Sequence, residues 1–236
     1  MAPATTEVTL ELTPSTRFDL INVAERVEDQ FGDVLSNYPQ ALYCSYHTTA
    51  GYLEESICAE LNHSPTSLQQ FIRSFQELFP PNADYHHDQL HLRTELSELQ
   101  RKREPRNADS HLTFIGSGLE NCVTYRNRPE KPVFFIDLDG VSGRSGRRQR
   151  QTTVIGYSEE QTVHQTQLSI PVSDHPIDSV NIANPRLGIF DQLQELLDRH
   201  GIEKDRIDIS LNPAEQHAGL TVNEYETLLM QYDIPE

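Results

Sequence analysis

Histidine is the residue type in this chain with the clearest potential for chemistry. Six of the ten histidines fall between His47 and His111. Three of them, His47, His87 and His111, stand in the distinctive polar segments SYHTTAGY, DYHHD and NADSHL. Neutral imidazole is the commonest transition-metal ligand, and three imidazoles with one water suit a catalytic Zn²⁺. We therefore expect zinc, or another divalent metal, on these three histidines. The alternative is that they are ordinary surface residues, because their spacing lacks the regularity of a helical metal motif.

Acidic residues accompany the histidines along the chain. A metal-bound histidine needs an acceptor for its other ring nitrogen, and Asp84, Asp88 and Asp109 are near enough in sequence to serve. We expect Asp109 or Glu55 to carry the proton in a metal-dependent reaction. The alternative for Glu54 and Glu55 is a solvated surface pair.

Four arginines lie between residues 144 and 150, in a chain with a net charge of −17. Guanidinium groups match the oxygens of phosphate and carboxylate, and the neighbouring glycines let backbone N–H groups approach an anion. We expect Arg144, Arg147 and Arg148 to bind an anionic or phosphorylated small molecule. The alternative is a flexible basic loop that pairs with the protein's own acids.

Two aspartates precede this loop at the end of an apolar segment. Asp137 and Asp139 are two residues apart, which places them on one face of a strand. They are candidates for a base, for metal ligands or for partners of the arginines. Alternatively, Asp139 and Gly140 form a turn for the backbone preferences of these residue types.

Composition excludes several classes of protein. With 36 acidic and 19 basic residues, the chain is a poor partner for nucleic acid. No stretch approaches the ~20 apolar residues that span a bilayer, so we expect no membrane insertion. Three cysteines without a CxxC pair argue against a disulfide framework, and MAPATTEVTL does not resemble a signal peptide. We therefore expect a cytoplasmic protein.

Hydrophobic periodicity predicts the elements that position these residues. The predicted strands are 5–12, 41–46, 112–115, 121–125, 133–138, 151–157 and 165–172. Predicted helices cover 18–35, a segment starting at Ser64-Pro65, part of 90–103 and a segment near Leu187 that Gly201 caps. Residues 140–150 read as a loop. We expect a β-rich core over residues 1–172 and an acidic, mostly helical extension over 173–236.

Four motifs in this order resemble the secondary thiamine-phosphate synthase family, the YjbQ-like proteins, over about residues 5–172. They are the segments 47–50 (HTTA), 85–87 (YHH), 107–112 (NADSHL) and 137–140 (DLDG) leading to the arginines. The resemblance implies an α/β (α+β) fold, with a compact mixed sheet, sandwich-like or barrel-like, and flanking helices. It also implies a homotrimer, a metal site on His47, His87 and His111 near a subunit boundary, and a weak thiamine-phosphate synthase activity. Arg147 and Arg148 match the arginines of the family.

The chain departs from the family pattern in several places, which keeps two functions open. Glu55-Ser56 replaces a family Asn-Glu pair, and the family Trp is missing because the chain has no tryptophan. The first hypothesis is a metal-dependent enzyme, a transferase or phosphoester hydrolase, acting on a small anionic molecule. The alternative is a non-catalytic, trimeric binding module whose acidic tail docks a partner.

Overall fold

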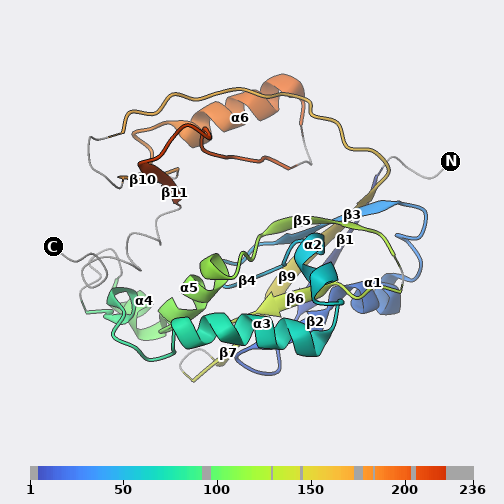
Figure 1. Ribbon diagram of the computed structural model, residues 1–236, viewed down its shortest axis with the longest axis horizontal. Coiled ribbons are helices and arrows are strands. Elements are labelled where there is room, and N and C mark those ends of the chain that lie inside the picture. Colours follow the sequence, from blue (N-terminus) through green and yellow to red (C-terminus); the bar gives the residue numbers. More distant parts are fainter. Residues whose placement is uncertain are drawn as a thin grey trace. The chain divides into compact units, whose positions relative to one another are not determined.

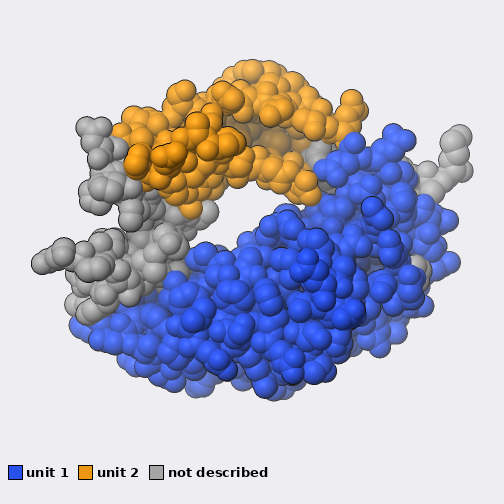
Figure 2. All heavy atoms as spheres, in the orientation of Figure 1, with its two compact units in different colours: residues 1–160 blue, residues 161–236 orange. Residues whose placement is uncertain are grey.

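The computed structural model of the chain is drawn in Figure 1. It describes residues 5–91, 97–128, 130–143, 146–172, 178–182, 184–202 and 206–221. The chain divides into two compact units, residues 1–160 and 161–236, which are described separately (Figure 2). The boundary expected from composition, after residue 172, falls inside the second unit.

Two antiparallel sheets and a short hairpin make up the β-structure of the first unit. The larger sheet has the order β1 (Thr5–Leu12), β9 (Arg150–Tyr157), β3 (Gln40–Ser45) and β5 (Cys122–Arg126). The smaller sheet has the order β2 (Asp19–Asn22), β6 (Phe134–Asp137) and β4 (Ala50–Gly51). The hairpin pairs β7 (Val141–Ser142) with β8 (Gly146–Arg147).

Strand β1 illustrates how alternating sequence sets the fold. Its side chains at Val8, Leu10 and Leu12 are buried, and most of those between them face solvent. This two-residue period matches a strand with one face on the core. The strand has the bounds that the sequence predicts, and it pairs with β9 from Thr5 opposite Tyr157 to Leu12 opposite Arg150.

Helices cover the sheets of this unit. They are α1 (Val23–Phe31), α2 (Glu55–Glu60), α3 (Pro65–Leu78), α4 (Glu98–Arg103), α5 (Ala108–Gly116) and the 3₁₀ turn η1 (His86–Asp88). Helix α3 starts as predicted, with Pro65 in its first turn and the Ser64 hydroxyl accepting a hydrogen bond from the Ser67 N–H. It packs against α5, as Figure 1 shows.

The predicted helix over residues 18–35 is wrong at its start. Residues Asp19–Asn22 form β2 and pair with β6, and the helix runs only over Val23–Phe31. The cap is Asn22, whose side chain accepts from the Glu25 N–H. Tertiary pairing with β6 therefore overrides the local helical spacing.

Three other predicted segments also differ. Residues 112–115, expected as a strand, belong to α5. The sequence does not reveal this helix because seven of its consecutive residues are buried, which leaves no amphipathic period. Residues 165–172 contain no strand, and the expected loop over 140–150 contains the β7–β8 hairpin. The α+β class is confirmed, and in the described part of the chain the sheets are open rather than closed into a barrel.

The second unit combines a helix with a small sheet. Strand β10 (Asp178–Asn181) pairs in parallel with β11 (Ala218–Thr221). Helix α6 (Ile189–His200) ends at Gly201, which adopts the left-handed conformation with φ 64°. This end confirms the glycine cap that the sequence predicts.

Candidate functional site

A group of buried polar side chains lies where η1, the start of α5 and the end of β6 meet. We call it the acid–histidine cluster, and its members are His87, Asp88, Asn107, Asp109, His111 and Asp139. Each is less than 9% exposed. Burial of so many ionisable groups is costly unless they are paired, so their contacts indicate what the cluster can do.

His87 and His111 form the centre of the acid–histidine cluster. Their ring centroids are 5.2 Å apart, with the planes inclined at 53°. Nδ1 of His87 is 3.0 Å from Oδ1 of Asp88. The sequence analysis proposed Asp88 as an acceptor behind a ligand histidine, and the structure places it there. Asp84, the other candidate in this loop, instead accepts from the Gln89 side chain.

Asp88 also organises the start of α5. Its Oδ1 accepts the backbone N–H groups of Asn107 and Ala108, both at 3.1 Å. Asn107 itself makes no side-chain cap on this helix. An acid from another segment therefore takes the place of a local cap, and it complements the positive end of the helix.

Asn107 connects the helix to the end of β6. Its Nδ2 donates to Oδ2 of Asp139 at 2.9 Å, and the Arg148 guanidinium donates to the same oxygen. Within the described residues, three buried atoms here have no hydrogen-bond partner: Oδ1 of Asn107, Oδ1 of Asp139 and Nε of Arg148. Such orphaned atoms are costly in a protein interior unless something else satisfies them.

Asp109 is paired with Arg17, which precedes β2. The guanidinium of Arg17 lies 2.7 and 2.8 Å from the two carboxylate oxygens. Burial raises the pKa of Asp109, the positive charge of Arg17 opposes this, and the nearby carboxylates of Asp88 and Asp139 raise the pKa further. Asp109 therefore holds a proton more readily than an ordinary aspartate, as a proton carrier must.

The arginine-rich segment is largely occupied by the protein's own acids. Arg150 makes two hydrogen bonds, of 2.7 and 2.8 Å, to the buried carboxylate of Asp137, and Arg148 pairs with Asp139. Arg147 is exposed on β8, and Arg144 lies outside the described residues. Arg148 and Arg150 therefore pair with buried acids of the protein, Asp139 and Asp137.

His47 occupies a different environment from His87 and His111. Its Nε2 accepts the Gln151 N–H at 2.9 Å, and its ring packs edge-on against Phe135. Burial, followed by the positive charge of Arg150, lowers the pKa of His47, whereas the negative charge of Asp137 opposes this. The ring is thus held in its neutral form with the Nε2 lone pair engaged.

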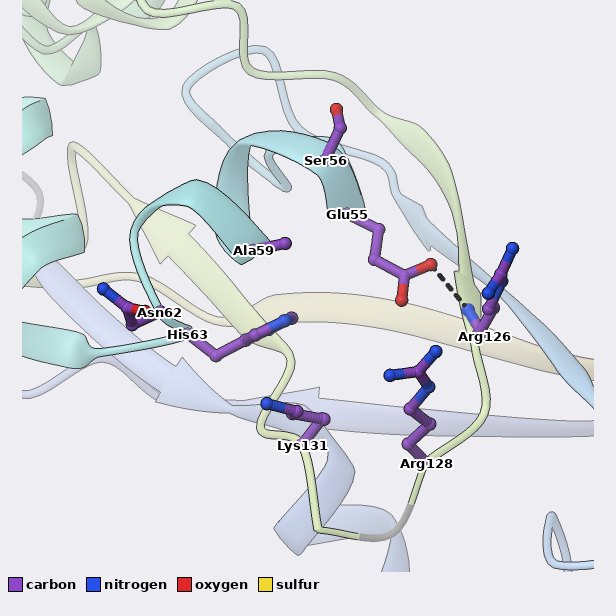
Figure 3. A pocket seen from close by; sticks show the side chains of 8 residues that line it. All are labelled: Glu55, Ser56, Ala59, Asn62, His63, Arg126, Arg128 and Lys131. Atoms are coloured by element: carbon purple, nitrogen blue, oxygen red, sulfur yellow. Dashed lines mark hydrogen bonds between the residues drawn. The ribbon is translucent and has the colours of Figure 1, made fainter.

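Glu55 is not a member of the acid–histidine cluster. It lies at the start of α2 and lines a separate pocket together with His63, Arg126, Arg128 and Lys131 (Figure 3). Its Oε2 accepts the Arg126 N–H at 2.9 Å. The two acids predicted as alternative proton carriers therefore lie in different places: Asp109 in the acid–histidine cluster and Glu55 in the separate pocket.

A metal centre can be assessed from these donors. Among the residues that the structure describes, no group of three or more His, Cys, Asp and Glu side chains is arranged to hold a metal ion. The rings of His87 and His111 lie close together, whereas His47 lies in a different environment. The three-histidine site therefore stays a prediction.

Arg17 and Asn107 were not predicted from the sequence as members of this network. Asn107 is part of the NADSHL segment that drew attention to His111, so a signal was present. Arg17 had no such signal, because its partner Asp109 is 92 positions away.

No described helix is long and apolar enough to traverse a bilayer.

Comparison with known proteins gives structural matches only. No protein-family profile matches the chain, and no curated protein is similar to it in sequence. The chain is similar to a YbjQ-like protein of unknown function from Sulfolobus solfataricus P2, with 17% identity and a TM-score of 0.43 over 66% of this chain and 98% of that one. It is similar to a hypothetical protein from Aeropyrum pernix K1, with 15% identity and a TM-score of 0.44 over 65% and 99%. An uncharacterised conserved YjbQ-family protein from Clostridium acetobutylicum matches with 17% identity and a TM-score of 0.38 over 62% and 97%.

Proposed function

We propose that the chain is a YjbQ-like protein that binds a divalent metal ion, zinc in the first instance, at His87 and His111. There it acts on a small phosphorylated or otherwise anionic molecule. The observation that carries the proposal is the buried pair of imidazoles with the carboxylate of Asp88 behind one of them. A carboxylate on the outer nitrogen of a histidine is the usual support of a metal ligand.

The donor set suits a metal. The ring centroids of His87 and His111 are 5.2 Å apart, and two imidazoles on one tetrahedral Zn²⁺, with Zn–N of about 2.0–2.1 Å, have centroids about 5 Å apart. Oδ1 of Asn107 belongs to the same buried cluster and has no hydrogen-bond partner among the described residues. A bound ion would supply a water of lowered pKa or polarise a substrate oxygen.

The surrounding side chains supply the rest of the chemistry. Nε of Arg148 is buried without a partner among the described residues, so the guanidinium retains a donor for an anionic oxygen. Asp109, with its raised pKa, holds the proton for a leaving or attacking group. This combination fits phosphoester hydrolysis or a transfer of the thiamine-phosphate synthase type.

Elemental analysis of the purified chain tests the metal. The double variant His87→Ala/His111→Ala is expected to lose a stoichiometric metal that the wild type carries. The matched control is His164→Ala/His200→Ala, which removes the exposed ring pair of the second unit, with centroids 4.6 Å apart, and should leave the metal in place. His47→Ala decides whether His47 is a third ligand. Unchanged metal content in the His87/His111 variant would refute the site.

A second function, binding without catalysis, is favoured by one observation. Both oxygens of Asp109 are bound by Arg17, and one oxygen of Asp139 is shared by Asn107 and Arg148. These pairs restrain the acids that a reaction would need to move. The chain would then be a metal-binding and ligand-binding module of a homotrimer whose acidic tail docks a partner. Turnover of p-nitrophenyl phosphate that a chelator abolishes supports the enzyme, and metal binding without turnover supports the module.

A further inference from the structure

A pocket outside the acid–histidine cluster carries a concentration of positive charge. We call it the basic pocket. Its volume is about 440 Å³, and its lining includes Glu55, His63, Arg126, Arg128 and Lys131 (Figure 3). Three cations around one hollow are unexpected in a chain with a net charge of −17. Their mutual repulsion is relieved when an anion binds among them.

In the part of the chain that the structure describes, no ion pair balances the charge of these cations. Within the described part of the chain, none of the Arg126, Arg128 and Lys131 side chains forms an ion pair. Glu55 lines the pocket, but its Oε2 is already engaged by the backbone N–H of Arg126. The guanidinium and ammonium donors are therefore available to a ligand.

His63 adds a buried acceptor to the basic pocket. It is 9% exposed, and Figure 3 shows its ring pointing toward Glu55, Arg128 and Lys131. Among the described residues its Nδ1 has no hydrogen-bond partner. With the ring proton on Nε2, Nδ1 is an acceptor. Nδ1 then presents a lone pair.

The electrostatics keep this lone pair free of a proton. Burial lowers the pKa of His63, and the positive charges of Lys131 and Arg128 lower it further, whereas the charge of Glu55 opposes this. At neutral pH the ring thus accepts a hydrogen bond and does not donate one from Nδ1. A matching ligand must be anionic and must also carry an O–H group.

We infer that the basic pocket is a second ligand site, for the phosphate group of a small molecule. Arg126, Arg128 and Lys131 contact the phosphate oxygens, and Nδ1 of His63 accepts a hydrogen bond from the ligand's hydroxyl. Inorganic phosphate at neutral pH supplies both features in one ion, because it retains at least one O–H. Sulfate has a similar shape but no O–H, and it cannot satisfy His63.

Isothermal titration of the full-length chain at pH 7.5 and constant ionic strength tests the cations. We expect saturable binding of inorganic phosphate at one site per chain. Arg128→Ala/Lys131→Ala should weaken it at least tenfold. The control Arg73→Ala, which removes an exposed charge from α3, should change it less than twofold. No saturable binding, or equal losses in the two variants, would overturn the inference.

The comparison with sulfate tests His63. Wild type should bind phosphate at least tenfold more tightly than sulfate, and His63→Ala should abolish that preference. His63→Asn should retain it, because asparagine keeps an acceptor near Nδ1 and tolerates the left-handed backbone at φ 48°. Equal affinity of the wild type for the two ions would contradict the role of His63.

The His87→Ala/His111→Ala variant separates this site from the proposed metal site. Its phosphate affinity should equal that of the wild type. If the variant loses phosphate binding, the anion belongs to the acid–histidine cluster and the inference of a second site is wrong.

Discussion

Oδ1 of Asp88 lies 3.0 Å from Nδ1 of His87 and also accepts the first backbone N–H groups at the start of α5. Helix α5 carries His111, whose ring is 5.2 Å from that of His87. One carboxylate therefore fixes the orientation of the first ring and the position of the helix that holds the second. The geometry of the histidine pair depends on this single side chain.

Replacing Asp88 should accordingly affect both stability and metal binding. Asp88→Ala removes a cap and leaves buried donors unpaired, so we expect the free energy of unfolding to fall by about 2 kcal/mol or more. We also expect zinc affinity to fall about 10–100-fold, as for other residues that support a metal ligand. Urea denaturation and competition with a zinc indicator measure the two effects.

The control is Asp84→Ala in the same loop. Asp84 is exposed and, among the described residues, accepts from Gln89 alone, so its loss should change stability by less than about 0.5 kcal/mol. Equal effects of the two substitutions would show that Asp88 has no special role.

The sequence permits the prediction of part of this site and not the rest. His87, His111 and Asp88 are recognisable because their residue types suit metal binding and because they lie in short polar segments. The pairs Arg17–Asp109 and Arg150–Asp137 are not recognisable in the sequence, since nothing in the local pattern of the chain says which acid a given arginine will contact. The sequence likewise does not show that Glu55 lies apart from Asp109, because this depends on where helices α2 and α5 pack.

Gly140 is needed for close packing rather than for turn conformation. A Cβ at this position would lie 2.4 Å from Cβ of Pro14 and 2.7 Å from the backbone oxygen of Thr16. Its N–H donates to the carbonyl of Arg17 at 2.8 Å, so the approach helps to place the partner of Asp109. A turn at Asp139-Gly140 was the alternative reading of the sequence, and the φ of Gly140 is not positive.

Gly140→Ala should therefore destabilise the fold. Overpacking of this kind lowers the free energy of unfolding by about 1–3 kcal/mol, which thermal or urea denaturation detects. Gly143→Ala is the matched control, because nothing lies within 4 Å of a Cβ there. A loss of stability in Gly143→Ala as large as in Gly140→Ala would contradict the packing explanation.

The secondary structure shows the same limit of local information. Strand β1 and the start of α3 follow from alternation and from Ser64-Pro65, signals contained in a few neighbouring residues. Strand β2 does not follow from such local signals, because Asp19–Asn22 is extended through its pairing with β6. Helix α5 was misread because its buried residues are consecutive, and burial on all sides erases the helical period.

The pair Arg150–Asp137 should be sensitive to the loss of either partner. Arg150 is 4% exposed and Asp137 0%, and two hydrogen bonds join them. Arg150→Met leaves a buried, unpaired carboxylate, so we expect a loss of about 3–5 kcal/mol in the free energy of unfolding. Adding Asp137→Leu should recover part of that loss, because it removes the unpaired carboxylate but also the acceptor of the Asp139 N–H. Arg147→Met, on the exposed strand β8, should have little effect on denaturation, and a loss there equal to that of Arg150→Met would count against the buried pair.

His47 should make stability depend on pH below neutrality. Burial and Arg150 lower the pKa of His47 in the folded state, so the unfolded chain takes up this proton first as the pH falls. The contribution of His47 is therefore fully present above the ordinary histidine pKa of about 6.5 and is lost as the pH falls toward the lower folded value. Protonation would also turn Nε2 into a donor facing the donor N–H of Gln151. His47→Gln keeps an acceptor for Gln151 and cannot titrate. Urea denaturation from pH 7.5 to 5.0 should thus show the wild type losing stability relative to His47→Gln on acidification. Parallel curves for the two proteins would mean that His47 has an ordinary pKa in the folded state.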